Sequence, residues 1–177
     1  MDVAIVSDTH IPSRATRIPE AFRERIQAAD HVIHAGDFDA ESTVADVQAL
    51  AQSLTAVRGN MDPNVGLPEV ATVELGGVEF VVTHGTGSKR GYEDRVANVV
   101  REHGSDETAS GARDTAVGAP DRLVGVAGHT HEVLDTVHGG VRLLNPGSVT
   151  GAAPASRATM MTATVEDGAV DLTLETL

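Results

Sequence analysis

Apolar and polar positions in the first half of the chain alternate between short β-type runs and amphipathic helical segments. The apolar runs predict strands at residues 2–7, 31–35 and 54–57. Phe22 and Ile26 share one face of a helix predicted at 18–29, and Val44 and Val47 mark a second helix. Strands and helices that alternate in this way are typical of an α/β domain.

Strands dominate the second half of the chain. The pattern predicts them at about 70–75, 78–83, 123–127, 133–137, 141–144, 158–166 and 169–175. Tyr92, Val96 and Val100 have helical spacing, and this helix is expected to end near Gly104. Residues 104–120 are polar and lack a period, so they are interpreted as a surface loop. Together these elements predict two packed sheets with helices outside them.

Composition agrees with one β-rich domain over residues 1–177. The chain has 24 Val but only four aromatic residues, so its core must be filled mainly by small branched side chains. It has no Cys, which excludes disulfides and thiolate metal sites. No apolar run is long enough for a membrane helix, and the first residues do not resemble a signal peptide. We therefore expect a cytoplasmic protein without a membrane partner.

The charge of the chain is strongly negative. The net charge is −13, and the cations are 12 Arg and a single Lys, Lys89. This surplus favours a protein from a high-salt cytoplasm. A large net charge keeps a protein soluble but destabilises the compact state through repulsion between like charges, and halophilic proteins make use of this effect. An ordinary acidic protein from a GC-rich genome is the alternative. In either case non-specific nucleic-acid binding is not expected, since it depends on basic side chains.

Seven side chains that can bind metal follow predicted strands. They are Asp8, His10, Asp37, Asn60, His84, His129 and His131. Asp8 and His10 are separated by one residue, and so are His129 and His131. In an extended segment such pairs point to the same side, so each could aim two ligands at one cleft. Ligands in α/β sheets gather beyond the carboxyl ends of strands, where all seven are predicted to lie.

The order of these motifs resembles that of the calcineurin-like metallophosphoesterases, particularly their small single-domain phosphodiesterase branch. The resemblance runs from Asp8 through Asn145-Pro146-Gly147-Ser148 to the last strands. It implies a four-layer α/β/β/α sandwich of two mixed β-sheets flanked by helices. It also implies that Asp8, His10 and His131 hold one metal, that Asn60, His84 and His129 hold another, and that Asp37 bridges them. Asp37, Asn60 and His129 are the expected catalytic residues.

The resemblance implies a phosphodiesterase that uses a metal-bridging hydroxide as nucleophile and acts on a small phosphodiester substrate. Two divalent ions per chain are expected: manganese first, with iron, nickel, cobalt or zinc as alternatives, because imidazole and carboxylate ligands suit these metals better than magnesium. A phosphomonoesterase using the same centre and a non-catalytic scaffold of the same fold are the competing functions. The formation of a homo-oligomer stays open.

Three positions near the ligands refine this picture. Many relatives carry a His after the metal-binding Asn that assists the leaving group, but this chain has Met61, which cannot donate a proton. Asp62 is interpreted either as a residue that orients a ligand or as a surface carboxylate. His34 matches no ligand position and is interpreted first as a residue with a plain packing role, with a supporting position next to the site as the alternative.

Overall fold

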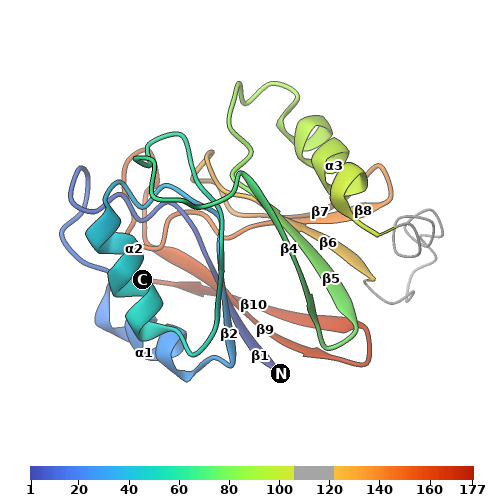
Figure 1. Cartoon of the computed structure of the whole chain (residues 1–177), viewed down its shortest axis with the longest axis horizontal. Coiled ribbons are helices and arrows are strands. Elements are labelled where there is room, and N and C mark those ends of the chain that lie inside the picture. Colours follow the sequence, from blue (N-terminus) through green and yellow to red (C-terminus); the bar gives the residue numbers. More distant parts are fainter. Residues whose placement is uncertain (106–121) are drawn as a thin grey trace.

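The computed structural model describes residues 1–105 and 122–177. The predicted loop 104–120 therefore lies almost wholly outside the described residues. Two mixed five-stranded sheets pack face to face, with helices on their outer surfaces (Figure 1). This arrangement confirms the predicted α/β/β/α sandwich.

The first sheet has the strand order β10-β9-β1-β2-β3. Its strands are β1 (Asp2–Val6), β2 (His31–His34), β3 (Leu54–Ala56), β9 (Thr159–Glu166) and β10 (Ala169–Thr176). Strands β1, β2 and β3 are parallel, while β9 pairs antiparallel with β1 and β10. Helices α1 (Glu20–Ala28) and α2 (Glu41–Leu50) cover the outer face.

The second sheet has the order β4-β5-β6-β8-β7. Its strands are β4 (Val70–Leu75), β5 (Val78–Thr83), β6 (Leu123–Val126), β7 (Leu134–His138) and β8 (Val141–Asn145). Strands β5, β6 and β8 are parallel, and β4 and β7 are antiparallel edges. Helix α3 (Tyr92–His103) packs on its outer face.

Strand β1 shows how the layers are held together. Val3 and Ile5 pack between the two sheets, whereas Ala4 and Val6 face the layer of α1 and α2. All four side chains are buried. Because β1 is covered on both faces, its sequence is a nearly continuous apolar run, as is usual for central parallel strands.

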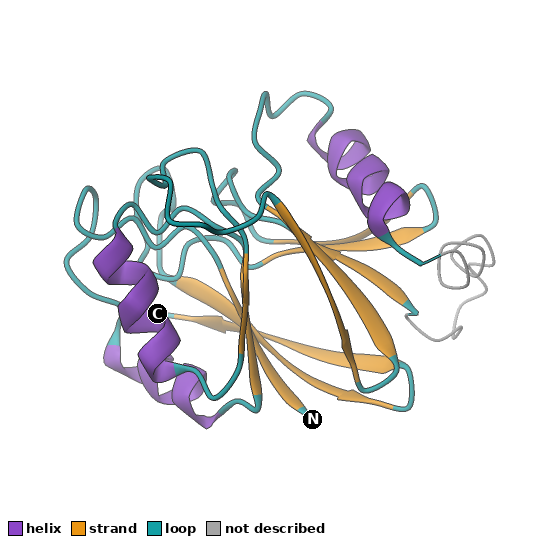
Figure 2. Cartoon of the chain, in the orientation of Figure 1, coloured by secondary structure: helices purple, strands orange, loops and turns teal. Residues whose placement is uncertain are grey.

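The parallel strands of both sheets deliver their carboxyl ends to the same end of the molecule, where the loops gather (Figure 2). The loops after β1, β2, β3, β5 and β6 carry the seven predicted metal ligands. The fold therefore converts five distant motifs into one cluster. In the described residues, no helix is long and apolar enough to span a bilayer.

Candidate metal centre

The backbone at five of the seven predicted ligands is left-handed rather than extended. Asp8 and His10 have φ angles of 52° and 49°, Asp37 has 60°, and His129 and His131 have 71° and 59°. The expected geometry of extended pairs is thus wrong. Each pair converges because its backbone turns sharply, a conformation that costs a non-glycine residue on the order of 1–3 kcal/mol and that concentrates at functional sites.

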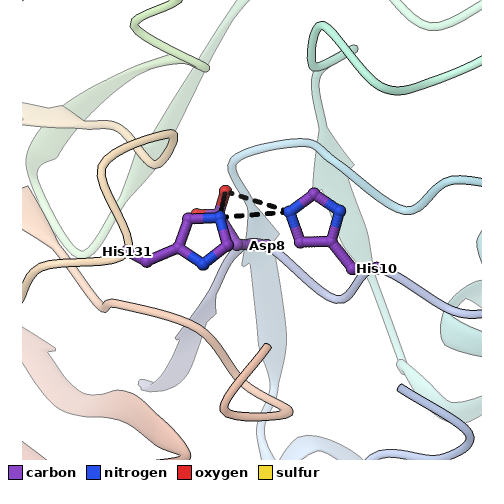
Figure 3. Close-up of side chains that lie close together, drawn as sticks. All are labelled: Asp8, His10 and His131. Atoms are coloured by element: carbon purple, nitrogen blue, oxygen red, sulfur yellow. Dashed lines mark hydrogen bonds and ion pairs between the residues drawn. The ribbon is translucent and has the colours of Figure 1, made fainter. Parts of the chain in front are cut away.

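The first cluster of ligand atoms joins Asp8, His10 and His131, all of which are buried. The Nε2 atom of His131 lies 3.2 Å from Asp8 Oδ1, and His10 Nε2 lies 3.8 Å from the same oxygen. Figure 3 shows both rings turned toward the carboxylate of Asp8. One carboxylate oxygen and two imidazole nitrogens therefore converge on one point.

The second cluster joins Asp8, Asp37 and His84 and shares Asp8 with the first. His84 Nε2 lies 3.2 Å from Asp37 Oδ2, and His10 Nε2 lies 3.5 Å from that oxygen. Asp37 thus faces imidazoles of both predicted metal sites. Such a position is what a ligand shared by two ions requires.

Asn60 and His129 form the exposed side of the centre. Asn60 Oδ1 and His129 Nδ1 are 2.8 Å apart, so two of the three residues predicted to hold the second metal are in contact. The backbone N–H of His129 also donates to the carboxylate of Asp8, at 3.1 Å to Oδ2. The ring of His129 packs edge-on against that of His84, with centroids 5.3 Å apart.

Hydrogen bonds fix the tautomers of three of the histidines. The Nδ1–H of His10 donates to Asp39 at 2.8 Å, that of His84 to Ala35 O at 2.6 Å, and that of His131 to Ala152 O at 2.8 Å. Each neutral ring therefore turns the lone pair of its Nε2 inward. Such bonds to the outer nitrogen are typical of metal-binding histidines.

Two observations show that these residues fit a cation. The Nε2 atoms of His10 and His131 are only 3.1 Å apart, although both carry lone pairs in the tautomers just described. Buried His84 Nε2 makes no hydrogen bond. Converging lone pairs without a proton between them are unfavourable unless a positive ion occupies the position that they face.

Protein groups also orient the two carboxylates. The Oγ–H of Ser7 donates to Asp8 Oδ2 at 2.5 Å, and the N–H of Met61 donates to Asp37 Oδ1 at 2.8 Å. Asp62 accepts four backbone N–H groups, those of Asp37, Phe38, Asp39 and Gly59. The interpretation of Asp62 as an orienting residue is thereby favoured, because it fastens the loops after β2 and β3 together.

The electrostatics of the centre link Asp37 to His84. Burial raises the pKa of Asp37, but the close contact with His84, the charge of His84 and the N–H of Met61 outweigh burial and leave this pKa below its ordinary value. Burial lowers the pKa of His84, yet Asp37 and Asp8 raise it overall. The pKa of His131 is raised in the same way by Asp8 against the effect of burial. The carboxylates therefore attract positive charge strongly to these imidazoles.

Glycine is needed where the loops approach the carboxylates. A Cβ at Gly59 would collide with the Asp37 side chain, including its Cγ at 2.8 Å. A Cβ at Gly128 would lie 2.7 Å from Asp8 Oδ2 and still closer to Ser7 Oγ. Only a bare backbone fits at these two positions.

Sequence reasoning assigned no role to Asp39 and left the role of His34 open. Asp39 orients His10 and also accepts a hydrogen bond from Ser13. His34 stacks on Phe38, with ring centroids 3.6 Å apart, and bonds Thr9 between two ligands, so it packs directly beneath the centre. Only their closeness in sequence to Asp8 and Asp37 could have indicated these roles.

The sequence comparisons agree with this geometry. A family model described as the calcineurin-like phosphoesterase superfamily domain matches residues 1–168. The chain belongs to this superfamily. A probable metallophosphoesterase of Methanothermobacter thermautotrophicus is 30% identical over 152 residues, which are 85% of this chain and 78% of that protein.

Solved structures of other proteins with this fold match essentially the whole chain. Vps29 of Entamoeba histolytica, solved with zinc, is 24% identical with a TM-score of 0.71, and the match covers 99% of each chain. An archaeal phosphodiesterase is 20% identical with a TM-score of 0.68 and full coverage of both chains. At these identities, the structural matches show a shared fold.

Proposed function

We propose that this member of the phosphoesterase superfamily is a phosphodiesterase with a centre for two divalent ions. The observation that carries the proposal is the pair of buried Asp and His clusters that share Asp8. Asp8, His10 and His131 would hold one ion. Asn60, His84 and His129 would hold the other, with Asp37 shared between them. Manganese is the first candidate, as the ligands are imidazole, carboxylate and amide groups.

The bound ions would supply an activated water at neutral pH and would stabilise negative charge on the phosphoryl oxygens. The residues of the chain supply position and charge. Asp8 and Asp37 contribute two negative charges, which leaves a positive surplus when two divalent ions are bound. This surplus suits a phosphodiester, which carries a single negative charge.

Two features favour diesters over monoesters. Met61 is 44% exposed beside Asn60, so no imidazole stands there to protonate a poor leaving group. Asn60 and His129 lie on the exposed side of the centre, which leaves room for the second ester group. A phosphomonoesterase is the second candidate on the same residues.

A scaffold function is the alternative outside catalysis, because Vps29 proteins share the fold over the whole chain. The inward lone pairs of His10, His84 and His131 favour an enzyme instead. A protein that only binds partners has no need to keep its buried imidazoles arranged for a cation.

The test is metal analysis of the purified chain, followed by hydrolysis of bis(p-nitrophenyl) phosphate and p-nitrophenyl phosphate with Mn, Fe, Ni, Co, Zn or Mg. We expect two ions per chain and faster hydrolysis of the diester. Faster monoester hydrolysis would select the second candidate. Absence of metal-dependent hydrolysis would remove the enzymatic proposal.

A further inference from the structure

A pocket of about 480 Å³ opens beside the exposed part of the candidate centre. Asn60 and His84, two of the predicted ligands, line one side of it. Arg58, Arg95, Asp62 and Glu69 supply the charged groups of its wall. A substrate held at the metal centre can therefore extend into a cavity with its own charges.

Most of the charges in this wall are already committed. Arg58 and Glu69 form an ion pair with Nη2 and Oε1 2.5 Å apart. The carboxylate of Asp62 is taken up by four backbone N–H groups. Arg95 is different: within residues 1–105 and 122–177, it forms no ion pair with a carboxylate.

In the described residues, the guanidinium of Arg95 meets neutral groups, namely carbonyl oxygens and the ring of Tyr92, whose centroid lies 5.8 Å from Cζ. Its Nη2 donates to Gly85 O and Ser88 O, both at 3.0 Å, and its Nη1 lies 3.5 Å from Gly91 O. Its Nε–H is buried and has no acceptor. A partly buried cation is unfavourable without an opposite charge, and an unmet donor adds to that cost.

We propose that this pocket binds a second anionic group of the substrate, a carboxylate or phosphate, through Arg95. The inference rests on the proposed phosphodiesterase function and narrows its substrate class to phosphodiesters that carry a further negative charge. An anionic oxygen would accept from the guanidinium and compensate its charge. Nη1 is the donor left for this oxygen, because Nη2 already donates to two carbonyls and Nε is buried, and a hydrogen bond between two charged groups is a strong one.

Arg95 also holds the loop between β5 and α3, since its carbonyl partners all lie in residues 85–91. A neutral donor could satisfy these carbonyls equally well. In a chain with a net charge of −13, an arginine without a carboxylate partner beside the centre is better explained by an anion that arrives with the substrate.

The test uses the manganese-loaded protein and two series of competitive inhibitors. Alkylphosphonates with one to four carbons bind through the phosphonate alone, and ω-carboxyalkylphosphonates of the same lengths add a carboxylate. At the length that reaches Arg95, we expect the carboxylate to tighten inhibition about tenfold, as for one charge-assisted hydrogen bond. Arg95→Gln should abolish this difference while methylphosphonate inhibits as before.

Arg101→Gln is the matched control, because Arg101 lies on the same helix, donates to Asn98 and Gly139, and does not line the pocket. It should keep the tenfold advantage. If Arg95→Gln does not fold, Val99→Asp keeps Arg95 but places a carboxylate one helical turn away from it, where it can pair with the guanidinium and repel a second anion, so it should weaken the carboxylates selectively.

The proposal is overturned if no carboxylate outperforms its alkyl counterpart in the native protein. It is also overturned if the advantage survives in Arg95→Gln or, where that variant is unfolded, in Val99→Asp. Methylphosphonate binding that does not depend on metal would instead contradict the metal centre of the proposed function, so the two failures are distinguishable.

Discussion

At the scale of single residues, the centre depends on backbone conformations that most side chains avoid. Asp8, His10, Asp37, His129 and His131 all have positive φ angles. Buried backbone bonds hold two of them: the Asp8 N–H donates to Gly36 O and the His10 N–H to Asp37 O, both at 3.0 Å. The strain is therefore stabilised by contacts between loops, and the ligands stay fixed before any ion arrives.

The proposed position of Asp37 as a ligand shared by two ions leads to the first prediction. Asp37→Asn removes one negative charge while keeping the shape of the side chain, so the centre should lose most of its metal. Changes in groups that merely support a ligand cost about 10–100-fold, and loss of a shared ligand should lower activity by more than that. Metal content and the rate of diester hydrolysis are the measurements.

The control is Asp46→Asn, which changes an exposed carboxylate on α2. It should retain native metal content and rate. Two ions per chain and a near-native rate in Asp37→Asn would show that Asp37 is not a shared ligand.

His34 leads to a prediction about acid stability. Its Nδ1 accepts the Gly36 N–H and its Nε2 bonds Thr9, so the buried ring is held neutral. Burial lowers the pKa of His34 to about 3 from an ordinary value of 6.5. Below pH 6.5 the unfolded chain binds a proton that the folded chain refuses, so this residue should reduce stability as pH falls from about 6.5 toward 3.

The measurement is the free energy of unfolding of the metal-free protein between pH 7 and pH 4, compared with that of His34→Gln. The native protein should lose up to about 1.4 kcal/mol more per pH unit than the variant, since only it carries this linkage. His103→Gln, at the exposed end of α3, controls for loss of a solvated imidazole. Parallel pH curves for native protein and His34→Gln would show that His34 titrates normally.

At the scale of elements, a buried polar network supports the loop that carries His129 and His131. The Nδ2 of Asn145, at the end of β8, donates to Gly128 O at 2.8 Å and to Thr130 Oγ1 at 3.0 Å. The hydroxyl of Tyr92, at the start of α3, donates to the same carbonyl at 2.8 Å. The turn that begins at Asn145 thus helps to position the loop that carries His129 and His131.

Asn145→Ala should destabilise the fold and weaken metal binding together. It removes donors that the fully buried Asn145 gives to Gly128 O and Thr130, at about 1–3 kcal/mol for buried groups left unpaired. Tyr92→Phe removes a single hydroxyl and should have a smaller effect on both. Chemical denaturation and metal titration are the measurements. Equal metal affinity in native protein and Asn145→Ala would show that the network does not position the loop.

The strands and helices were predictable because their side chains obey simple periods. Each predicted strand agrees with the structure within one residue at either end, and β4 and β5 agree at both ends. The Gly76-Gly77 and Asp167-Gly168 turns lie in left-handed backbone between paired strands, as hairpins require. Local patterns were sufficient because each of these elements is defined by neighbours in sequence.

The geometry of the site was less predictable. Spacing placed the seven predicted ligands at strand ends but suggested extended pairs, since positive φ angles at Asp and His leave no mark in the sequence. The role of Asp39 depends on a contact between the loop after β2 and the loop after β1, where its carboxylate meets His10. The order of the strands in the sheets determines which loops meet, and this order cannot be inferred from local periodicity.

At the scale of the whole molecule, the acidic charge should govern the response to salt. With a net charge of −13 and one Lys, the compact state repels itself at low ionic strength. At 1 M salt the screening length shrinks to about 3 Å, which removes most of this repulsion. We expect the midpoint of thermal unfolding to be higher in 3 M than in 0.1 M KCl, and activity to follow the same order.

A charge variant separates screening from a general effect of salt on hydrophobic burial. Four exposed carboxylates make no ion pair in the part of the chain that the structure describes: Glu24, Asp46, Glu102 and Asp171. Replacing all four with Lys brings the net charge from −13 to −5, because each exchange adds two positive charges. If repulsion is the cause, the variant should be more stable than the native protein in 0.1 M KCl, and its unfolding midpoint should rise much less on transfer to 3 M KCl. An equal rise of the midpoint in both proteins would assign the effect of salt to hydrophobic burial. A native midpoint that does not rise with salt would contradict the high-salt interpretation of the sequence.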